Sequence, residues 1–191
     1  MQKQAFQKQN DRHNLDPETL QDLQESLYEW QIYNFGDQDN ERVLLGVCEE
    51  VGELCHAVLK KEQGIRGTPE EHDNELRDAI GDIMIYTLNY LSKIKAKVTN
   101  LAVRDDVEKN DDPKRTRESV LACFRIIGKL TDPPNRENVQ LINQMIIQLS
   151  FLCALRGWSL EKIVRDTWSR VGKRDWKKFP DTGEGPESSE E

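Results

Sequence analysis

Two stretches of the chain combine a helical apolar repeat with closely spaced acidic residues. The first carries Glu50 and Glu53, and the second carries Asp78 and Asp82. At about 100° per residue, Glu50 and Glu53 lie roughly 60° apart on one helix face, and Asp78 and Asp82 lie about 40° apart. Each pair therefore occupies one side of a helix, which limits how these two helices can pack.

Apolar residues at helical spacing accompany the acids instead of lying on the opposite face. Packing the two apolar stripes together brings the carboxylates toward each other, and such a cluster repels itself unless cations neutralise it. Carboxylate oxygens suit Mg²⁺ or Mn²⁺ and not zinc. The alternative is a pair of solvated helix faces, because acid pairs are common when 32% of the residues are charged. The apolar residues are Val47, Val51, Leu54 and Val58 in the first stretch, and Ile80, Ile83, Met84 and Tyr86 in the second.

The composition favours a core built from narrow amphipathic helices. The chain has 191 residues, of which 36% are hydrophobic, and a mean hydropathy of −0.77. A net charge of −8 argues against a general nucleic-acid binder, but a single nucleotide can be met through a metal and a local basic patch. Residues 1–14 are too polar for a signal peptide, and no apolar run of transmembrane length is expected. We therefore expect a cytoplasmic protein with a small-molecule partner and neither nucleic acid nor membrane.

The four cysteines show no C-x-x-C spacing, and each lies in an apolar helical context. Cysteine is often a core residue, so we expect buried free thiols. The pair Cys55-His56 does not predict a zinc site, because the nearest spaced cysteine is distant and a fourth ligand is missing. The cysteines are Cys48, Cys55, Cys123 and Cys153.

Helix caps and breakers divide the chain into helices, and no segment predicts a strand, so we expect an all-α fold. Asp16 caps the first helix, and Asn135 caps the fifth. We expect a disordered tail over residues 1–16, a single domain over 17–179 and a disordered acidic tail over 180–191. The predicted helices run over residues 17–35, 39–62, 69 to between 93 and 97, 115–130, 136–156 and 159–176, with a polar connector over 99–114.

The two acidic helices resemble the two helices after the connector, which predicts an insert or a degenerate repeat within residues 99–156. Residues 44–54 resemble 120–130, and residues 81–88 resemble 143–150. Under this overlay the apolar scaffold persists while the acids vanish. The alternative is that any two amphipathic helices align passably. The acids Glu50, Glu53, Asp78 and Asp82 fall on Ile126, Lys129, Gln140 and Gln144.

The acidic motifs resemble those of a known family. Glu49-Glu50-Val51-Gly52-Glu53, followed by Asp82-Ile83-Met84-Ile85-Tyr86, resembles the E-E-x-x-E and E-x-x-D signature of the MazG-like all-α nucleoside triphosphate pyrophosphohydrolases. Relatives in this superfamily include dimeric dUTPases and dCTPases. The resemblance covers residues 27–91 and resumes over residues 168–183.

This chain departs from the family pattern in its second motif. In the register that ends on Asp82, Ala79 occupies the glutamate position. The alternative register, Glu75-x-x-Asp78, matches the signature but displaces the apolar run after it. We favour Asp78 and Asp82 with Glu75 peripheral, and in this register we expect Ala79→Glu to raise turnover.

The resemblance implies a four-helix-bundle-like core, a homodimer or higher homo-oligomer, and hydrolysis of an NTP or dNTP to the monophosphate and pyrophosphate. It implies Mg²⁺, or Mn²⁺ in its place, held by Glu50, Glu53, Asp78 and Asp82. Glu50 and Glu53 would be the catalytic residues, with Glu50 orienting the water that attacks the α-phosphorus. Two alternatives stay open: a narrower dUTPase- or dCTPase-type hydrolase, and a catalytically weakened nucleotide-binding regulatory protein.

Basic and aromatic residues near the motifs are candidates for substrate binding. Lys60 and Arg66 flank the loop between the acidic helices, and Lys173 and Arg174 belong to the densest basic patch. They would bind phosphates, and a solvated helix end favoured by its dipole is the alternative for the patch. Trp30 would stack on the base, with a place in the core as its alternative.

Overall fold

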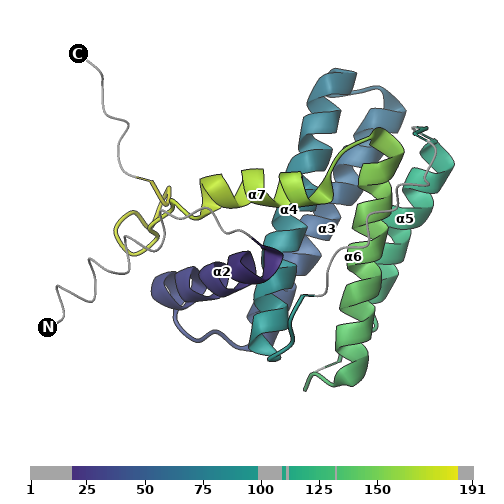
Figure 1. Ribbon diagram of the computed structural model, residues 1–191. Helices are drawn as coiled ribbons and strands as arrows, with labels where there is room; N and C mark the ends of the chain where they lie inside the picture. The colour runs from purple at the N-terminus through teal and green to yellow at the C-terminus, as the bar shows by residue number, and fades with distance from the viewer. Residues whose placement is uncertain (1–18, 99–108, 111, 132, 185–191) are drawn as a thin grey trace, which may run out of the picture.

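The computed structural model describes residues 19–98, 109–110, 112–131 and 133–184, which contain six α-helices and no strand (Figure 1). This confirms the all-α expectation for that part of the chain. The predicted N-terminal tail and most of the predicted connector lie outside the described residues. The helices are α2 (Leu20–Phe35), α3 (Asn40–Gln63), α4 (Pro69–Lys93), α5 (Pro113–Ile127), α6 (Arg136–Arg156) and α7 (Leu160–Val171).

Two helical hairpins form the body of the molecule. The first consists of α3 and α4 and the second of α5 and α6, with α5 packed against α3 and α6 against α4. α2 and α7 both pack against α4, and α7 starts beside the end of α6 (Figure 1). α4 is thus the central helix, which explains why its second half is apolar on nearly every side. The internal repeat of the two hairpins stays a prediction.

Local capping sets several helix boundaries. At the start of α4, the Thr68 hydroxyl accepts the Glu71 N–H, and the Glu71 carboxylate accepts the Thr68 N–H. Asn135 caps α6 in the same reciprocal way with Asn138, and Ser159 caps α7. The predicted starts of these three helices are confirmed.

Two other helices begin at residues that differ from the sequence prediction. α2 begins at Leu20, later than predicted, because Thr19 and Asp22 form a reciprocal cap there. α5 begins at Pro113, earlier than predicted, with Asp112 as its cap. Proline suits the first helical position because the N–H that it lacks would have no partner inside the helix.

The last helix, α7, stops short of Trp176, which the sequence predicts to be helical. The backbone N–H of Trp176 donates to Asn34 Oδ1 at 2.8 Å, and that of Asp175 donates to the Gly183 carbonyl at 2.6 Å. Donors that are bound to distant partners cannot continue the hydrogen-bond ladder of a helix. Residues 180–184 form a turn in this arrangement, where the sequence predicts a disordered tail.

By length and composition alone, α6 is apolar enough to cross a membrane, with a mean hydropathy of 1.3 over its most apolar window. In this fold 56% of that window is buried, and the helix packs against α5 and α4. From the sequence we expect no apolar run of transmembrane length, and by this measure α6 is such a run. A helix in the core of a bundle needs such a composition, because neighbouring helices cover much of its surface.

The four cysteines are free thiols, but only Cys123 and Cys153 are buried. Burial raises the pKa of both thiols to about 12. Cys48 is exposed and Cys55 is half-buried. The expectation of buried thiols therefore holds for two of the four, because α3 turns part of its face to solvent.

Candidate active site

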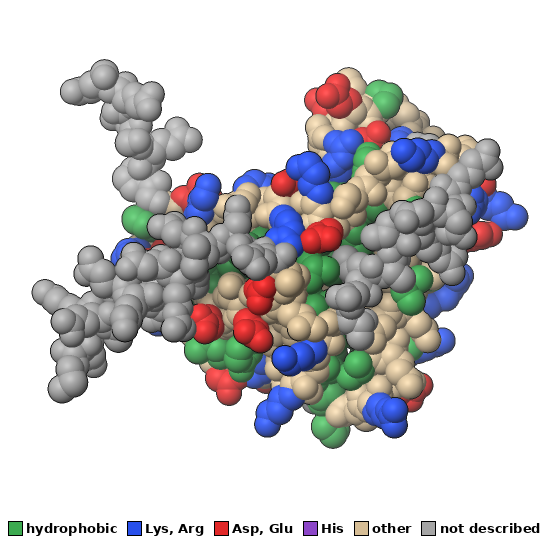
Figure 2. Space-filling view, viewed as in Figure 1, with side chains coloured by type: hydrophobic (Ala, Val, Ile, Leu, Met, Phe, Trp, Pro, Cys, Tyr) green, Lys and Arg blue, Asp and Glu red, His purple; other side chains and the backbone are tan. Residues whose placement is uncertain are grey.

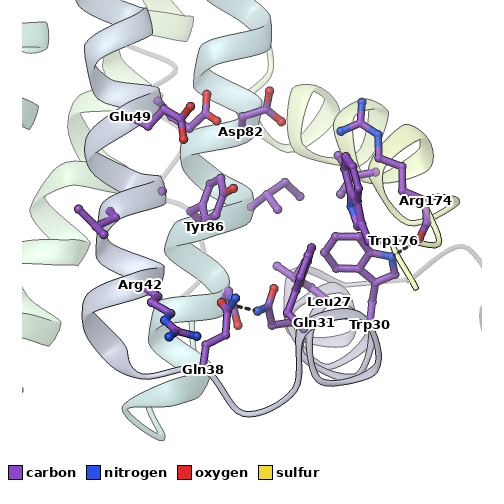
Figure 3. A pocket seen from close by; sticks show the side chains of 17 residues that line it. Leu27, Trp30, Gln31, Gln38, Arg42, Glu49, Asp82, Tyr86, Arg174 and Trp176 are labelled. Carbon is purple, nitrogen blue, oxygen red and sulfur yellow. Dashed lines mark hydrogen bonds between the residues drawn. The ribbon is translucent and has the colours of Figure 1, made fainter. Parts of the chain in front are cut away.

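A cavity of about 370 Å³ lies where α2, α3 and α4 meet the segment after α7 (Figure 3). Acidic side chains line one end, aromatic side chains line one wall, and amide side chains together with Arg42 line the other end. Helical spacing explains this lining, because α4 contributes Asp82, Tyr86 and Asn89 at i, i+4 and i+7. α3 likewise contributes Gly46 and Glu50 from successive turns. The volume falls within the range of small-molecule sites.

Glu50 has an unusual environment for a carboxyl group. Burial, followed by the negative charges of Asp82 and Glu53, raises its pKa to about 8. Its Oε2 atom is buried and has no hydrogen-bond partner among the described residues. Ionised Glu50 is therefore stabilised only when a positive charge reaches this end of the cavity.

Asp82 belongs to the same acidic end, and arginines adjoin it. Burial raises the pKa of Asp82, the Asp78 charge adds to this increase, and the guanidinium groups of Arg170 and Arg174 oppose it. Asp78 itself accepts a hydrogen bond from Arg170 Nη2 at 2.7 Å. Both partners of this ion pair are exposed, so it adds little stability.

The four carboxylates predicted to hold a cation share one electrostatic environment, although only Glu50 and Asp82 line the cavity. Among the side chains that the structure describes, no three His, Cys, Asp or Glu groups lie close enough together, as they stand, to hold a metal ion. The donor chemistry nevertheless fits Mg²⁺, since the cluster offers carboxylate oxygens and Glu50 Oε2 is buried without a partner. The assignment of Mg²⁺ stays a prediction.

Ala79, which occupies the glutamate position of the family signature, is 2% exposed and lies in the hydrophobic core. A glutamate there would bury a carboxylate among apolar side chains. We therefore expect Ala79→Glu to damage the fold, which corrects the sequence-based expectation of higher turnover. The Glu75 carboxylate lies 3.2 Å from His72 Nδ1 and, like Glu53 and Asp78, does not line the cavity, so its peripheral placement stays a prediction.

Trp30, Phe35 and Trp176 form the aromatic wall of the cavity. Trp30 and Phe35 meet edge to face with ring centroids 5.7 Å apart, and Phe35 lies 6.4 Å from Trp176. The Trp30 indole N–H donates to the Arg174 carbonyl at 2.9 Å. Trp30 is therefore a core residue that also lines the cavity, while Phe35, which is 44% exposed, has the freer ring.

Of the four basic residues predicted to bind phosphate, only Arg174 lines the cavity. Its guanidinium lies 5.9 Å from the centroid of the Trp176 ring. Lys60, Arg66 and Lys173 lie outside the lining, so this cavity does not support their predicted role. On the face shown in Figure 2, basic side chains are interspersed with acidic ones over α7.

The amide end of the cavity is absent from the sequence-based predictions. Gln31 Nε2 on α2 donates to Gln38 Oε1, in the loop before α3, at 2.7 Å (Figure 3). Asn89 joins them from α4. One sequence signal could have indicated Asn89: it is a polar residue two helical turns after Asp82 in a mostly apolar run.

Tyr86 lies between the acidic end and the amide end (Figure 3). Its ring passes so close to α3 that a Cβ atom on Gly46 would lie 2.2 Å from Tyr86 Cε1. Gly46 therefore provides the room that the ring occupies. Burial raises the pKa of the Tyr86 phenol, and the negative charges of Glu50 and other nearby acids raise it further. The hydroxyl therefore keeps its proton at neutral pH.

The cavity thus joins an acidic end, suited to a cation and the anion that it accompanies, to an aromatic and amide end suited to a flat polar ring. Arg174 lies beside the acidic end, where it adds a fixed positive charge. Comparison of the chain with known protein families, with curated proteins and with solved structures found no match in any of the three.

Proposed function

We propose that this protein is a Mg²⁺-dependent nucleoside triphosphate pyrophosphohydrolase of the MazG-like kind. It would convert an NTP or dNTP and water to the monophosphate and pyrophosphate. The observation that carries the proposal is one cavity with carboxylates of raised pKa at one end and aromatic and amide side chains at the other. Asp82 and Asn89 lie two helical turns apart on α4, about 10 Å. A nucleotide spans a comparable distance from its α-phosphate to the far edge of its base.

Each part of the cavity has a role in this reaction. Mg²⁺ bound by Glu50, Glu53, Asp78 and Asp82 would neutralise the substrate phosphates and make a water molecule more acidic. Arg174 adds positive charge beside the phosphates. Trp30 and the other aromatic residues offer ring faces on which a base can stack.

Glu50 is suited to hold or accept the proton of the attacking water. A carboxyl group with a pKa of about 8 retains its proton at neutral pH, and a nearby cation lowers that pKa by favouring the ionised form. Glu50 therefore combines the role of ligand with that of general base.

The first test is to incubate the purified protein with each common NTP and dNTP, with Mg²⁺ and then with EDTA. Pyrophosphate and orthophosphate are assayed separately. We expect metal-dependent release of pyrophosphate and monophosphate, and the rates would identify a narrower dUTPase- or dCTPase-type preference. Glu50→Gln should lower turnover on the order of 10²-fold or more, because it removes a cation ligand and the proton acceptor.

The matched control is Glu41→Gln, which removes an exposed carboxylate from the same helix outside the cavity. It should leave turnover unchanged. Equal activity of Glu50→Gln and Glu41→Gln, or orthophosphate as the released product, would contradict the proposal.

A second candidate is a nucleotide-binding regulatory protein with little turnover. The Asp78–Arg170 ion pair favours it, because an arginine already neutralises one of the predicted cation ligands. Nucleotide binding without release of pyrophosphate, with Mg²⁺ and with Mn²⁺, would identify this case. The expected homo-oligomer and cytoplasmic location stay predictions.

A further inference from the structure

Asn89 has a buried polar side chain at a position where the fold itself calls for an apolar one. It is 2% exposed and lies in the run of α4 that contributes most to the core, next to buried Leu88 and Tyr90. Its Oδ1 atom is buried and has no hydrogen-bond partner within the described part of the chain. An unpaired buried carbonyl costs stability, so a ligand that supplies a donor would stabilise this side chain.

Asn89 also lines the cavity, at the end remote from the carboxylates. In the proposed enzyme the phosphates lie with the cation at the acidic end. Tyr86, one turn closer to Asp82, lies at the level of the sugar. The moiety that reaches Asn89 is then the base, which can stack on the aromatic wall beside the Gln31–Gln38 pair.

We propose that Asn89 reads the nucleobase: its side-chain carbonyl accepts a hydrogen bond from an N–H group on the edge of the base. The inference rests on the proposed function, because it assigns the ends of the same cavity. A carbonyl oxygen is an acceptor, so phosphate oxygens and the ribose ring oxygen cannot pair with it. The sugar hydroxyls can donate, but in the proposed pose they lie at the level of Tyr86, one turn of α4 before Asn89. Nucleobase N–H groups can donate to it, and they are either exocyclic amines or ring imides.

Matched pairs of nucleoside 5′-monophosphates test the proposal. Cytidine monophosphate is compared with the monophosphate of pyrimidin-2-one riboside, which lacks the exocyclic amine. Uridine monophosphate is compared with its N3-methyl derivative, which lacks the imide N–H. Dissociation constants are measured by calorimetry with Mg²⁺ present, so the readout does not require turnover.

We expect the wild-type protein to bind the donor-bearing member of one pair about 10- to 100-fold more tightly, because the analogue leaves Asn89 Oδ1 unpaired. Discrimination in the first pair identifies an amino-bearing base, and discrimination in the second identifies an imide-bearing one. Equal binding within both pairs would overturn the proposal. If none of the four pyrimidine compounds binds, adenosine monophosphate is compared with purine riboside monophosphate and inosine monophosphate with its N1-methyl derivative, and equal or absent binding there overturns it.

Asn89→Leu should abolish the discrimination and leave the melting temperature equal or higher, because leucine has a similar size and no polar atoms. The matched control is Thr87→Val, which removes another unpaired buried oxygen from α4, outside the cavity lining. It should keep the wild-type discrimination. If Asn89→Leu fails to fold, the four compounds and the wild-type protein still decide the outcome.

These measurements separate this inference from the proposed function. A protein that releases pyrophosphate but binds both members of each pair equally keeps the proposed function and loses the role of Asn89. A protein that discriminates within a pair but hydrolyses no nucleotide keeps the role of Asn89 and loses the proposed activity.

Discussion

The hairpin of α3 and α4 and the hairpin of α5 and α6 are both pairs of packed helices, but they differ in the acidic groups that they bury. The first places Glu50 and Asp82 at one end of the cavity. In the sequence overlay, Ile126 and Gln144 take these positions in the second hairpin. Ile126 is buried in the core and Gln144 is exposed, so neither position holds a buried charge there. The first hairpin therefore contains partly buried acidic groups that lower its stability.

Unpaired polar atoms of the first hairpin lie at the same cavity. Such atoms destabilise a fold and are concentrated at functional sites, where a ligand supplies the missing partner. Glu50 and Asn89 are the two unpaired groups of the first hairpin that line the cavity. Within the described residues, the buried unpaired side-chain atoms of α3 and α4 are Glu50 Oε2, His72 Nε2, Thr87 Oγ1 and Asn89 Oδ1.

The largest expected effect tests how strictly the first hairpin limits where carboxylates are tolerated. Ala79→Glu should lower the free energy of unfolding by about 3–5 kcal/mol, because it buries a charge and overpacks the core. Urea denaturation measures this loss. Ala122→Glu on α5, where the alanine is only half-buried, should cost clearly less. A stable Ala79→Glu protein with raised turnover would support the alignment in which Ala79 takes the glutamate position of the family signature.

A smaller effect tests the close approach between α3 and Tyr86. Gly46→Ala should cost about 1–3 kcal/mol, because the new Cβ atom would lie 2.2 Å from the Tyr86 ring. The displaced ring should also weaken nucleotide binding. Gly128→Ala at the end of α5 is the control: its Cβ would lie 3.8 Å from the nearest atom, so stability should change by less than about 0.5 kcal/mol. Equal losses in the two variants would show that the contact does not shape the cavity.

The smallest effect concerns pH. Glu50 has a pKa of about 8 in the folded protein, against 4.5 for a free glutamate side chain. The folded state therefore holds a proton that the unfolded state has released, so the stability of the metal-free protein falls as pH rises through this interval. Glu50→Gln removes this penalty. In EDTA its melting temperature should exceed that of the wild type at pH 9 but not at pH 5.

We expect an advantage of about 1 kcal/mol at pH 9, or about 2–4 °C, since Glu50 is only half-buried and water screens part of the repulsion. Mg²⁺ should reverse the order, because it stabilises the wild-type cluster. Glu118→Gln on α5 removes an exposed carboxylate and should give a small difference that does not vary with pH. A pH-independent gain in Glu50→Gln would show that its carboxylate is not repelled by its neighbours.

Helix positions follow largely from neighbouring residues, which is why they could be predicted. Thr68, Asn135 and Ser159 cap the helices at which the sequence placed them. Capping and helical hydrogen bonds join residues no more than a few positions apart, so the pattern is legible in the chain itself. The end of α7 could not be predicted in this way, because the Trp176 N–H binds Asn34, far away in the sequence.

The candidate site divides along the same line. The spacing of Glu50, Glu53, Asp78 and Asp82 on two helix faces was visible in the sequence. The sequence did not show which basic residue lies beside these acids. Arg174 lines the cavity, and its neighbour Lys173 does not. The direction in which residues after the end of a helix point depends on long-range contacts and not on their spacing.

The sequence by itself determined the helices, their caps and the two acidic faces, because these depend on backbone hydrogen bonds and periodicity within a few residues. Only the tertiary structure decided that Glu50 is buried enough to hold its proton at neutral pH, that Ala79 faces the core, and that Asn89 lies in the cavity without a partner. Burial, electrostatic repulsion and hydrogen-bond satisfaction depend on every segment that packs around a group, and these segments come from distant parts of the chain.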